Sequence, residues 1–198
     1  MKTLILFAHP RLEKSKINKA LLARIPKHKD LVFHDLYEAY PDFNIDIDRE
    51  KELLTEHDMI IWQHPFYWYS CPPLLKQWID LVLEFGWAYG PGGNALNGKK
   101  IFNSITTGGA SDAYQHEGRN RFTVNEFLAP FDQTATLCKM QYLPPFAVQG
   151  THRLSDEHLQ QAVEQYEQLL HMILNDQLDM EKIAGLKLMN HAFETSKH

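Results

Sequence analysis

Aromatic side chains are concentrated in one short segment, residues 62–69, which reads Trp-Gln-His-Pro-Phe-Tyr-Trp-Tyr. The apolar run just before it, residues 58–62, has the composition of a strand that is buried on both faces. After Pro73, apolar residues recur every three or four positions, which is typical of an amphipathic helix. A hydrophobic core would scatter such rings, whereas a loop that stacks a flat ligand gathers them. The segment therefore indicates a loop between a strand and a helix that binds a planar molecule.

A second candidate is Thr106-Thr107-Gly108-Gly109, at the end of a predicted strand. Two hydroxyl groups and two unhindered backbone amides can meet the edge of a planar ring there, because glycine permits a close approach. A plain turn is the alternative interpretation of these four residues. The binding interpretation gains weight only if other candidate loops lie at the same edge of the sheet.

A third candidate is the loop from His9 to Asn18, which leads into a predicted helix. Free N–H groups at the start of a helix attract anions, and the side chains of Ser15 and Asn18 add donors. His9 adds a partial positive charge if its pKa lies near the ordinary value of about 6.5. These features predict a phosphate site. In the alternative interpretation Ser15 only caps the helix and His9 fills a turn.

Metal and hydrolytic chemistry find no support in the sequence. The eleven histidines include no HExxH pair and no Cys/His quartet, so no metal site is expected. No G-x-S-x-G motif is present, and Ser70 has no identifiable base.

A glycine-rich stretch at Gly90, Gly92 and Ala95 has the spacing of a dinucleotide fingerprint but the wrong context. A true fingerprint follows a strand and opens a helix, whereas this stretch follows a helix and precedes a strand. Residues 86–98 are therefore predicted to form a mobile loop. Its Trp87 and Tyr89 either close over a pocket or a second subunit, or simply anchor a surface loop.

The elements that must position these loops alternate between strand and helix. Strands are predicted at residues 2–8, 31–36, 59–62 and 100–106, with a fifth at 140–143 or 146–148. Helices are predicted from Ser15 to about residue 25, over 48–57, from Pro73, around 127–138, and from Ser155, while 37–47 is a long connection. Nearly all-apolar strands between helices indicate an α/β fold, a flavodoxin-like three-layer sandwich with a five-stranded parallel sheet of order 2-1-3-4-5. Ligands of such sheets lie at the carboxyl ends of the strands, where all three candidate loops emerge.

Length and composition favour one domain, residues 1–175, followed by a tail over 176–198. The tail mixes charged residues with Met and Phe and has no clear place in the core; an extra helix, a dimer arm and partial disorder all remain open. A net charge of −5 gives no basic field for a nucleic acid. Two distant cysteines, no apparent signal segment and no apolar run of about 18 residues favour a reduced, cytoplasmic protein.

The ordered set of motifs resembles a known family, the flavodoxin-like NAD(P)H:quinone oxidoreductases. The resemblance is marked for the small ancillary flavoproteins of glutathione-regulated potassium-efflux systems. It rests on the joint order of Phe7-Ala8-His9-Pro10, Tyr40-Pro41-Asp42-Phe43-Asn44-Ile45-Asp46, Gln63-His64-Pro65-Phe66-Tyr67-Trp68-Tyr69, Pro73-Leu74-Leu75-Lys76, Gly86-Trp87-Ala88-Tyr89-Gly90, Thr106-Thr107-Gly108-Gly109 and Leu143-Pro144-Pro145-Phe146.

The resemblance implies a bound flavin and assigns residues to each part of it. The phosphate is expected near His9, Ser15, Ile17 and Asn18, the isoalloxazine ring against Pro65, Phe66, Tyr67, Trp68 and Tyr69, and the pyrimidine edge on Thr106, Thr107, Gly108 and Gly109. FMN is favoured over FAD, because the long C-terminal extension of the larger relatives is lacking. Tyr114 is placed like the tyrosine that polarises the flavin carbonyl. The histidine that follows this tyrosine in the larger enzymes is missing, since residues 117–121 read Glu-Gly-Arg-Asn-Arg and His116 is close but displaced.

The resemblance also implies an activity and partners. NAD(P)H would reduce the flavin by hydride transfer to N5, and a quinone would then take the hydride in the same slot, in a ping-pong cycle. A homodimer that uses the segments around Trp68 and Trp87 is expected. The alternative role is a regulatory ancillary subunit of a potassium-efflux antiporter, peripheral at the inner face of the membrane. A one-electron carrier like flavodoxin is disfavoured, because such carriers are markedly acidic and the charge of −5 is modest.

Overall fold

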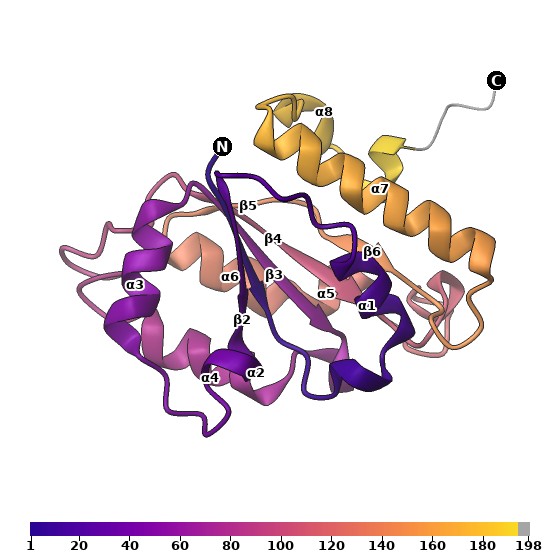
Figure 1. Ribbon diagram of the computed structural model, residues 1–198, viewed down its shortest axis with the longest axis horizontal. Helices are drawn as coiled ribbons and strands as arrows, with labels where there is room; N and C mark the ends of the chain where they lie inside the picture. Colours follow the sequence, from indigo (N-terminus) through magenta and orange to yellow (C-terminus); the bar gives the residue numbers. More distant parts are fainter. Residues whose placement is uncertain (194–198) are drawn as a thin grey trace.

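A parallel β-sheet forms the centre of the computed structural model, which describes residues 1–193 (Figure 1). Its strands are β1 (Thr3–Phe7), β2 (Leu31–Asp35), β3 (Met59–Pro65), β4 (Lys100–Thr106), β5 (Gln141–Tyr142) and β6 (Phe146–Val148). The order is β2-β1-β3-β4, with β5 and β6 both paired to β4, and every pairing is parallel. The predicted order 2-1-3-4-5 is confirmed.

The fifth position of the sheet is shared by two short strands. The segments 140–143 and 146–148 were alternatives in the sequence, and both pair with β4, at its beginning and at its end. Pro144 and Pro145 lie between them and have no N–H to donate to a ladder, so the edge strand is interrupted there. The second half, β6, carries the chain back to the carboxyl edge of the sheet.

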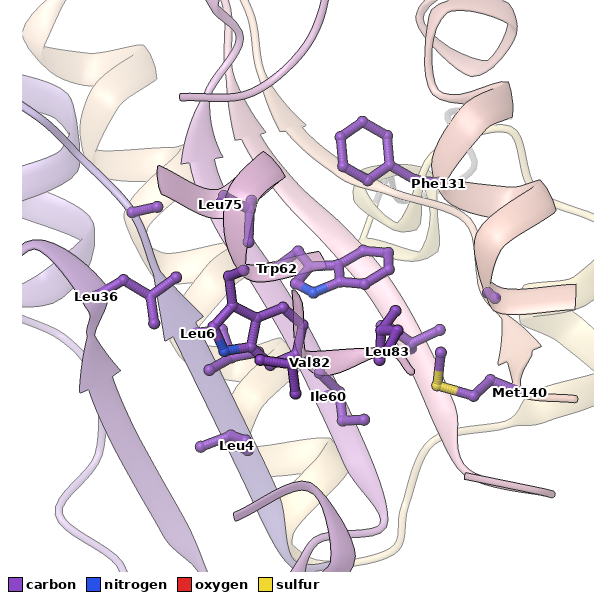
Figure 2. Packing of buried hydrophobic residues seen from close by; sticks show 14 of the residues in the cluster. Leu4, Leu6, Leu36, Ile60, Trp62, Leu75, Val82, Leu83, Phe131 and Met140 are labelled. Atoms are coloured by element: carbon purple, nitrogen blue, oxygen red, sulfur yellow. The ribbon is translucent and has the colours of Figure 1, made fainter. Parts of the chain in front are cut away.

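Helices cover both faces of the sheet, as the apolar strands predicted. One face packs against α2 (Leu36–Ala39), α3 (Ile47–Glu56), α4 (Pro73–Val82), α5 (Val124–Phe127) and α6 (Ala129–Leu137). Figure 2 shows this layer, in which Trp62 of β3 lies among side chains such as Leu75, Val82 and Phe131. The other face packs against α1 (Lys16–Leu22) and α7 (Asp156–Leu174), which lie on one side of the sheet in Figure 1.

The strand β3 continues three residues beyond the predicted end at residue 62, through Gln63, His64 and Pro65. The two polar side chains each make a hydrogen bond in the interior, although Gln63 Nε2 has no partner among residues 1–193. The Oε1 atom of Gln63 accepts from the Tyr166 hydroxyl at 2.7 Å, and His64 contacts the Pro65 carbonyl oxygen at 3.0 Å and Asn103 at 3.0 Å. Burial lowers the pKa of His64 to about 4, so this ring is neutral at neutral pH.

Two segments differ from their predicted description. The helix α2 lies inside the predicted connection 37–47, where the Asp35 carboxylate caps it by accepting from the backbone N–H of Tyr37 at 2.9 Å. In the glycine-rich segment 86–98, Trp87 and Tyr89 pack against the hydrophobic core between the sheet and the helices α2–α6, which agrees with the alternative in which they anchor a surface loop. Their contact with a second subunit stays a prediction.

The tail is more closely integrated than expected. Residues 176–193 include α8 (Met180–Ala184) and η4 (Met189–Phe193). Leu178, Ile183 and Met189 are buried in the hydrophobic core between the sheet and the helices α1 and α7, which we call the second core cluster. This differs from the expectation that residues 176–198 have no clear place in the core, and the extra helix is the alternative that residues 176–193 adopt. Residues 194–198 lie outside the described part of the chain, and the division at residue 175 stays a prediction.

Across residues 1–193 no helix combines the length and apolar character that a membrane span requires.

Candidate functional site

A cavity of about 630 Å³ opens where the carboxyl ends of β1, β3 and β4 meet, and the loops that follow these strands form most of its wall. Further residues come from the loop after β6. The structure thus brings the three candidate loops together at one edge of the sheet. The predicted residues that line the cavity are His9, Ser15, Ile17, Asn18, Pro65, Phe66, Tyr67, Trp68, Tyr69, Thr106, Gly108, Gly109 and Tyr114.

Two predicted residues are not part of this wall. Thr107 is fully buried behind it, and its hydroxyl donates to the Gly109 carbonyl oxygen at 2.7 Å, so it shapes the turn. His116 points to the outside, where its side chain is 64% exposed and Nε2 lies 3.7 Å from a Glu126 carboxylate oxygen. A catalytic role for His116 stays a prediction, and its position does not place it near the cavity.

The start of α1 presents donors to the cavity. The Ser15 hydroxyl accepts from the backbone N–H of Asn18 at 3.2 Å and so caps the helix, while Lys16 and Ile17, as its first residues, have N–H groups without a partner in the helix. The Asn18 amide group donates to Ser15 Oγ at 3.0 Å and to Thr106 Oγ1 at 3.1 Å, which joins this loop to the end of β4. Asn18 Oδ1 is buried and finds no hydrogen-bond partner within residues 1–193.

His9 does not carry the partial positive charge that was expected, because its pKa is lowered. Its ring is buried, Nδ1 accepts from the backbone N–H of Arg11 at 3.1 Å, and burial lowers the pKa of His9 below its ordinary value despite the opposing charge of Glu13. A lowered pKa leaves an imidazole neutral at neutral pH, so His9 is not the source of positive charge. Arg11, Lys14 and Lys16, on the same loop, line the cavity and supply that charge.

The aromatic loop contains η2 (Tyr67–Tyr69) and has an unusual backbone. Trp68 and Tyr69 adopt positive φ angles of 50° and 63°, a left-handed conformation that is costly for large side chains. Two rings of this loop differ in burial: Phe66 is buried against Tyr114 and Phe127, whereas Trp68 is 92% exposed. The loop therefore offers one ring to the interior and another to the rim of the cavity.

The two glycines after β4 are required by close neighbours. A Cβ atom on Gly108 would lie 2.4 Å from Nε2 of His152, and one on Gly109 would lie 3.1 Å from the ring of Tyr114. Any side chain at these positions would displace rings that line the cavity. A plain turn, the alternative interpretation of residues 106–109, would not require glycine for this reason.

Tyr114 follows η3 (Ser111–Ala113) and has a protonated hydroxyl at neutral pH. Burial raises the pKa of Tyr114 above its ordinary value, and the neighbouring Thr107 hydroxyl and the charge of Arg119 oppose that shift only in part. The hydroxyl is thus able to donate a hydrogen bond over the whole neutral range.

Sequence reasoning did not select several residues of the wall, namely Arg11, Lys14, Lys16, Arg119, Asn120, Thr151 and His152. The first three lie within the predicted loop 9–18, so their positive charges could have been recognised in the sequence as part of the predicted phosphate site. Thr151 and His152 follow β6, and their place depends on the pairing of β6 with β4, which the sequence left open between two segments. The lining contains no Asp or Glu, although the chain carries a net charge of −5.

The cavity has no metal-binding character. No group of three or more His, Cys, Asp or Glu side chains within the described residues is arranged to hold a metal ion. The site instead combines cationic side chains, free backbone donors and aromatic rings, which suits an anionic ligand with a planar polar ring.

Comparison with known proteins gives the following similarities. The family model described as a flavodoxin-like fold matches residues 1–170. A relative from Salmonella newport, the ancillary protein KefG of a glutathione-regulated potassium-efflux system, is 47% identical over 158 residues, which cover 80% of this chain and 86% of the relative.

Two solved structures are similar over most of their length. General stress protein 14 of Treponema denticola, in complex with FMN, has a TM-score of 0.80 and 38% identity over 90% of this chain and 100% of that one. An NADPH-quinone reductase from P. pentosaceus has a TM-score of 0.78 and 35% identity over 86% of this chain and 98% of that one.

Proposed function

This chain belongs to the family with the flavodoxin-like fold, and from that premise we propose that it is a flavin-dependent NAD(P)H:quinone oxidoreductase. The observation that carries the proposal is the convergence of a cationic loop, an aromatic loop and a diglycine turn on one cavity of about 630 Å³. The similarity to an FMN complex and to an NADPH-quinone reductase supports the same cofactor and substrates for this chain.

The residues present fit FMN. A phosphate would be held by the backbone N–H groups of Lys16 and Ile17, the Ser15 hydroxyl and the nearby cationic side chains. The buried Oδ1 of Asn18 lacks a donor within residues 1–193, and a ribityl hydroxyl would supply one. Gly108 and Gly109 line the cavity, and their backbone N–H groups, free of protein acceptors among residues 1–193, would be the donors for the pyrimidine edge.

When bound, FMN supplies the N5 atom through which NAD(P)H and a quinone exchange a hydride in turn, in a ping-pong cycle. The protein orients the two rings and excludes water from the space between them. The Tyr114 hydroxyl, which stays protonated and lines the cavity, would donate to the carbonyl edge of the flavin and stabilise negative charge there, an effect of the oxyanion-hole type. FAD is the alternative cofactor, and either NADH or NADPH is the donor.

Anaerobic stopped-flow measurement tests this function directly. The yellow FMN-loaded protein is expected to bleach on mixing with NADPH and to regain its colour on mixing with a benzoquinone. Repeating both steps with the Tyr114→Phe variant separates hydride uptake from flavin binding. FMN that stays oxidised with both NADPH and NADH would contradict the enzymatic proposal.

We further propose that the protein is a homodimer whose interface covers the mouth of the cavity. Trp68 is 92% exposed at the rim, and Tyr69 and Phe122, at 47% and 46%, are the next exposed rings of this region. A second copy would bury these rings and close the site. Light scattering at micromolar concentration is expected to give the mass of a dimer for the wild type and of a monomer for Trp68→Glu, whereas a monomeric wild type would contradict the dimer.

The identity with KefG favours a second candidate function, in which the protein docks on a potassium-efflux transporter at the inner face of the membrane and raises its activity. Potassium efflux measured in cells with and without this protein distinguishes the roles. A variant that no longer binds FMN, such as Asn18→Leu, is the informative comparison. Stimulation by both proteins would make the regulatory role independent of redox chemistry, and no stimulation by either would leave a free-standing reductase.

A further inference from the structure

Arg119 is the cation of the cavity that the proposed FMN phosphate does not use. Arg11, Lys14 and Lys16 belong to the loop after β1, and Lys16 already pairs with Asp156 at 2.5 Å. Arg119 instead belongs to the loop after β4, which also carries Tyr114. It makes no ion pair with any of residues 1–193, so its charge is not neutralised by a neighbour.

The backbone around Arg119 is held firmly. The N–H of Asn120 donates to the Ala113 carbonyl oxygen at 3.0 Å. The N–H of Gly118 donates to the Gln115 carbonyl oxygen, also at 3.0 Å. A Cβ atom on Gly118 would lie 2.3 Å from the Asp112 carbonyl oxygen, so the chain passes this point in close contact with the preceding turn. The hydroxyl of Tyr69, on the aromatic loop, lies 3.4 Å from Asn120 Oδ1 on the other side of the loop. The position of residue 119 relative to Tyr114 is therefore defined by the fold.

Other candidates for a positive charge at this end of the cavity are less suitable. His116 is directed away, toward Glu126. His152 lies against Gly108 on the loop after β6, not on the loop that carries Tyr114. Arg119 and Arg121 are both exposed, but only Arg119 lines the cavity. The charge of Arg119 acts on Tyr114, where it opposes the rise in the pKa of that hydroxyl.

On the basis of the proposed function, we propose that Arg119 is a catalytic residue whose positive charge stabilises the electron-rich carbonyl edge of the bound flavin. Hydride transfer adds two electrons and one proton to the flavin while NAD(P)H leaves as NAD(P)⁺, so the flavin gains one negative charge. A guanidinium close to that charge favours the electron-rich state over the neutral oxidised one. Because arginine does not titrate, this contribution needs no proton from the protein.

The test is the two-electron midpoint potential of bound FMN in the wild type and in the variants Arg119→Ala, Arg119→Lys and Arg121→Ala. Loss of the charge in Arg119→Ala is expected to lower the ratio of reduced-FMN to oxidised-FMN affinity about tenfold, which corresponds to about 30 mV for a two-electron couple. Arg119→Lys retains the positive charge, so its midpoint potential is expected to stay close to that of the wild type. Arg121→Ala, which removes the same charge from the same loop but outside the cavity, leaves the potential unchanged.

A second readout separates this role from plain binding. Affinity for oxidised FMN, measured by fluorescence titration, is expected to stay within about twofold in Arg119→Ala, because the oxidised ring carries no net charge. An unchanged potential, an equal fall in Arg121→Ala, or loss of oxidised-FMN binding would overturn the inference. An unchanged potential with a raised KM for NADPH would assign Arg119 to the phosphates of the substrate instead. A wild type that binds no flavin would overturn the proposed function as well, whereas the other outcomes overturn this inference alone.

Discussion

At the residue scale, the fold buries a few polar atoms and leaves them without a partner among residues 1–193. Asn18 shows this most clearly, because its amide group is tied to Ser15 and Thr106 while its Oδ1 atom is buried without a donor among residues 1–193. Leaving such an atom unpaired costs about 1–3 kcal/mol, so a ligand that supplies a donor recovers that cost. The sequence indicated Asn18 only as one donor in a loop; its contact with Thr106 joins residues far apart in the chain and required the fold.

Replacing Asn18 with Ala is expected to weaken FMN binding about 10- to 100-fold, because both the ligand contact and the link to β4 are lost. Fluorescence titration of the apo-protein with FMN measures this change. Asn97→Ala, at an exposed asparagine away from the cavity, is the matched control and is expected to bind like the wild type. Equal affinities for Asn18→Ala and the control would refute the assignment of this side chain to the flavin.

Replacing Tyr114 with Phe is expected to slow flavin reduction by NADPH at least about tenfold while FMN stays bound, because one donor to the carbonyl edge is removed. Burial raises the pKa of Tyr114, so its hydroxyl remains protonated up to and beyond its ordinary value of about 10. The wild-type rate of reduction is therefore expected to show no loss from Tyr114 ionisation between about pH 7 and 9.5. A reduction rate that is the same in Tyr114→Phe would rule out this role.

At the scale of elements, the buried carboxylate of Glu50 links one helical layer to the sheet through hydrogen bonds. Glu50 of α3 is fully buried and accepts from the Trp78 indole of α4 at 2.7 Å, from the Tyr40 hydroxyl at the end of α2 at 2.5 Å, and from His34 Nε2 of β2 at 2.7 Å. Burial by itself raises the pKa of Glu50, but the three hydrogen bonds outweigh it and hold the pKa below its ordinary value. Four elements thus share one anionic centre.

Glu50→Gln is expected to lower the free energy of unfolding at pH 7 by about 2–4 kcal/mol, because an amide cannot accept from all three donors. A carboxyl with a depressed folded pKa stabilises the fold above its unfolded pKa, and this stabilisation is lost as the pH falls through the folded pKa. The difference between variant and wild type should therefore shrink below about pH 4. Urea unfolding at pH 7 and at pH 3 measures both effects, and an equal difference at the two values would contradict the ionised state of Glu50.

The strands and the main helices could be predicted from the sequence because each has a periodic apolar pattern on a short, continuous segment. The helix α2 was missed because it depends on local capping, since Asp35 starts it through its own side chain. The choice between 140–143 and 146–148 stayed open in the sequence because both segments are strands through their pairing with β4. The same reason explains the site: its loops 9–18, 62–69 and 106–109 were recognisable, but the place of Thr151 and His152 depends on the pairing of β6 with β4, which the sequence left open.

At the scale of the whole molecule, the C-terminal segment completes one face of the sheet beyond the part matched by the family model, which ends at residue 170. The N–H of Met189 donates to the Pro145 carbonyl oxygen at 2.9 Å, and Asn190 Oδ1 accepts from the N–H of Ala147 at 2.9 Å. Because β6 is an edge strand, these bonds satisfy backbone groups that would otherwise be free. The segment also supports the strand that leads to His152.

Removing residues 176–198 is expected to lower the free energy of unfolding by at least about 3 kcal/mol, because Leu178, Ile183 and Met189 leave the second core cluster. The truncated chain retains the family domain and should still bind FMN. Urea unfolding and FMN titration of the two proteins give both values. A truncated protein as stable as the full chain would show that the segment contributes nothing to the core.

The most direct measurement of the central claim, that three loops at one edge of the sheet form a flavin site, is the titration of the apo-protein with FMN followed by flavin fluorescence and absorption. Saturable binding of one FMN per chain is expected, together with a structured visible spectrum, and Asn18→Ala is expected to need about 10- to 100-fold more FMN to reach the same spectrum. A folded protein that remains colourless and leaves the fluorescence of added FMN and FAD unchanged would contradict it.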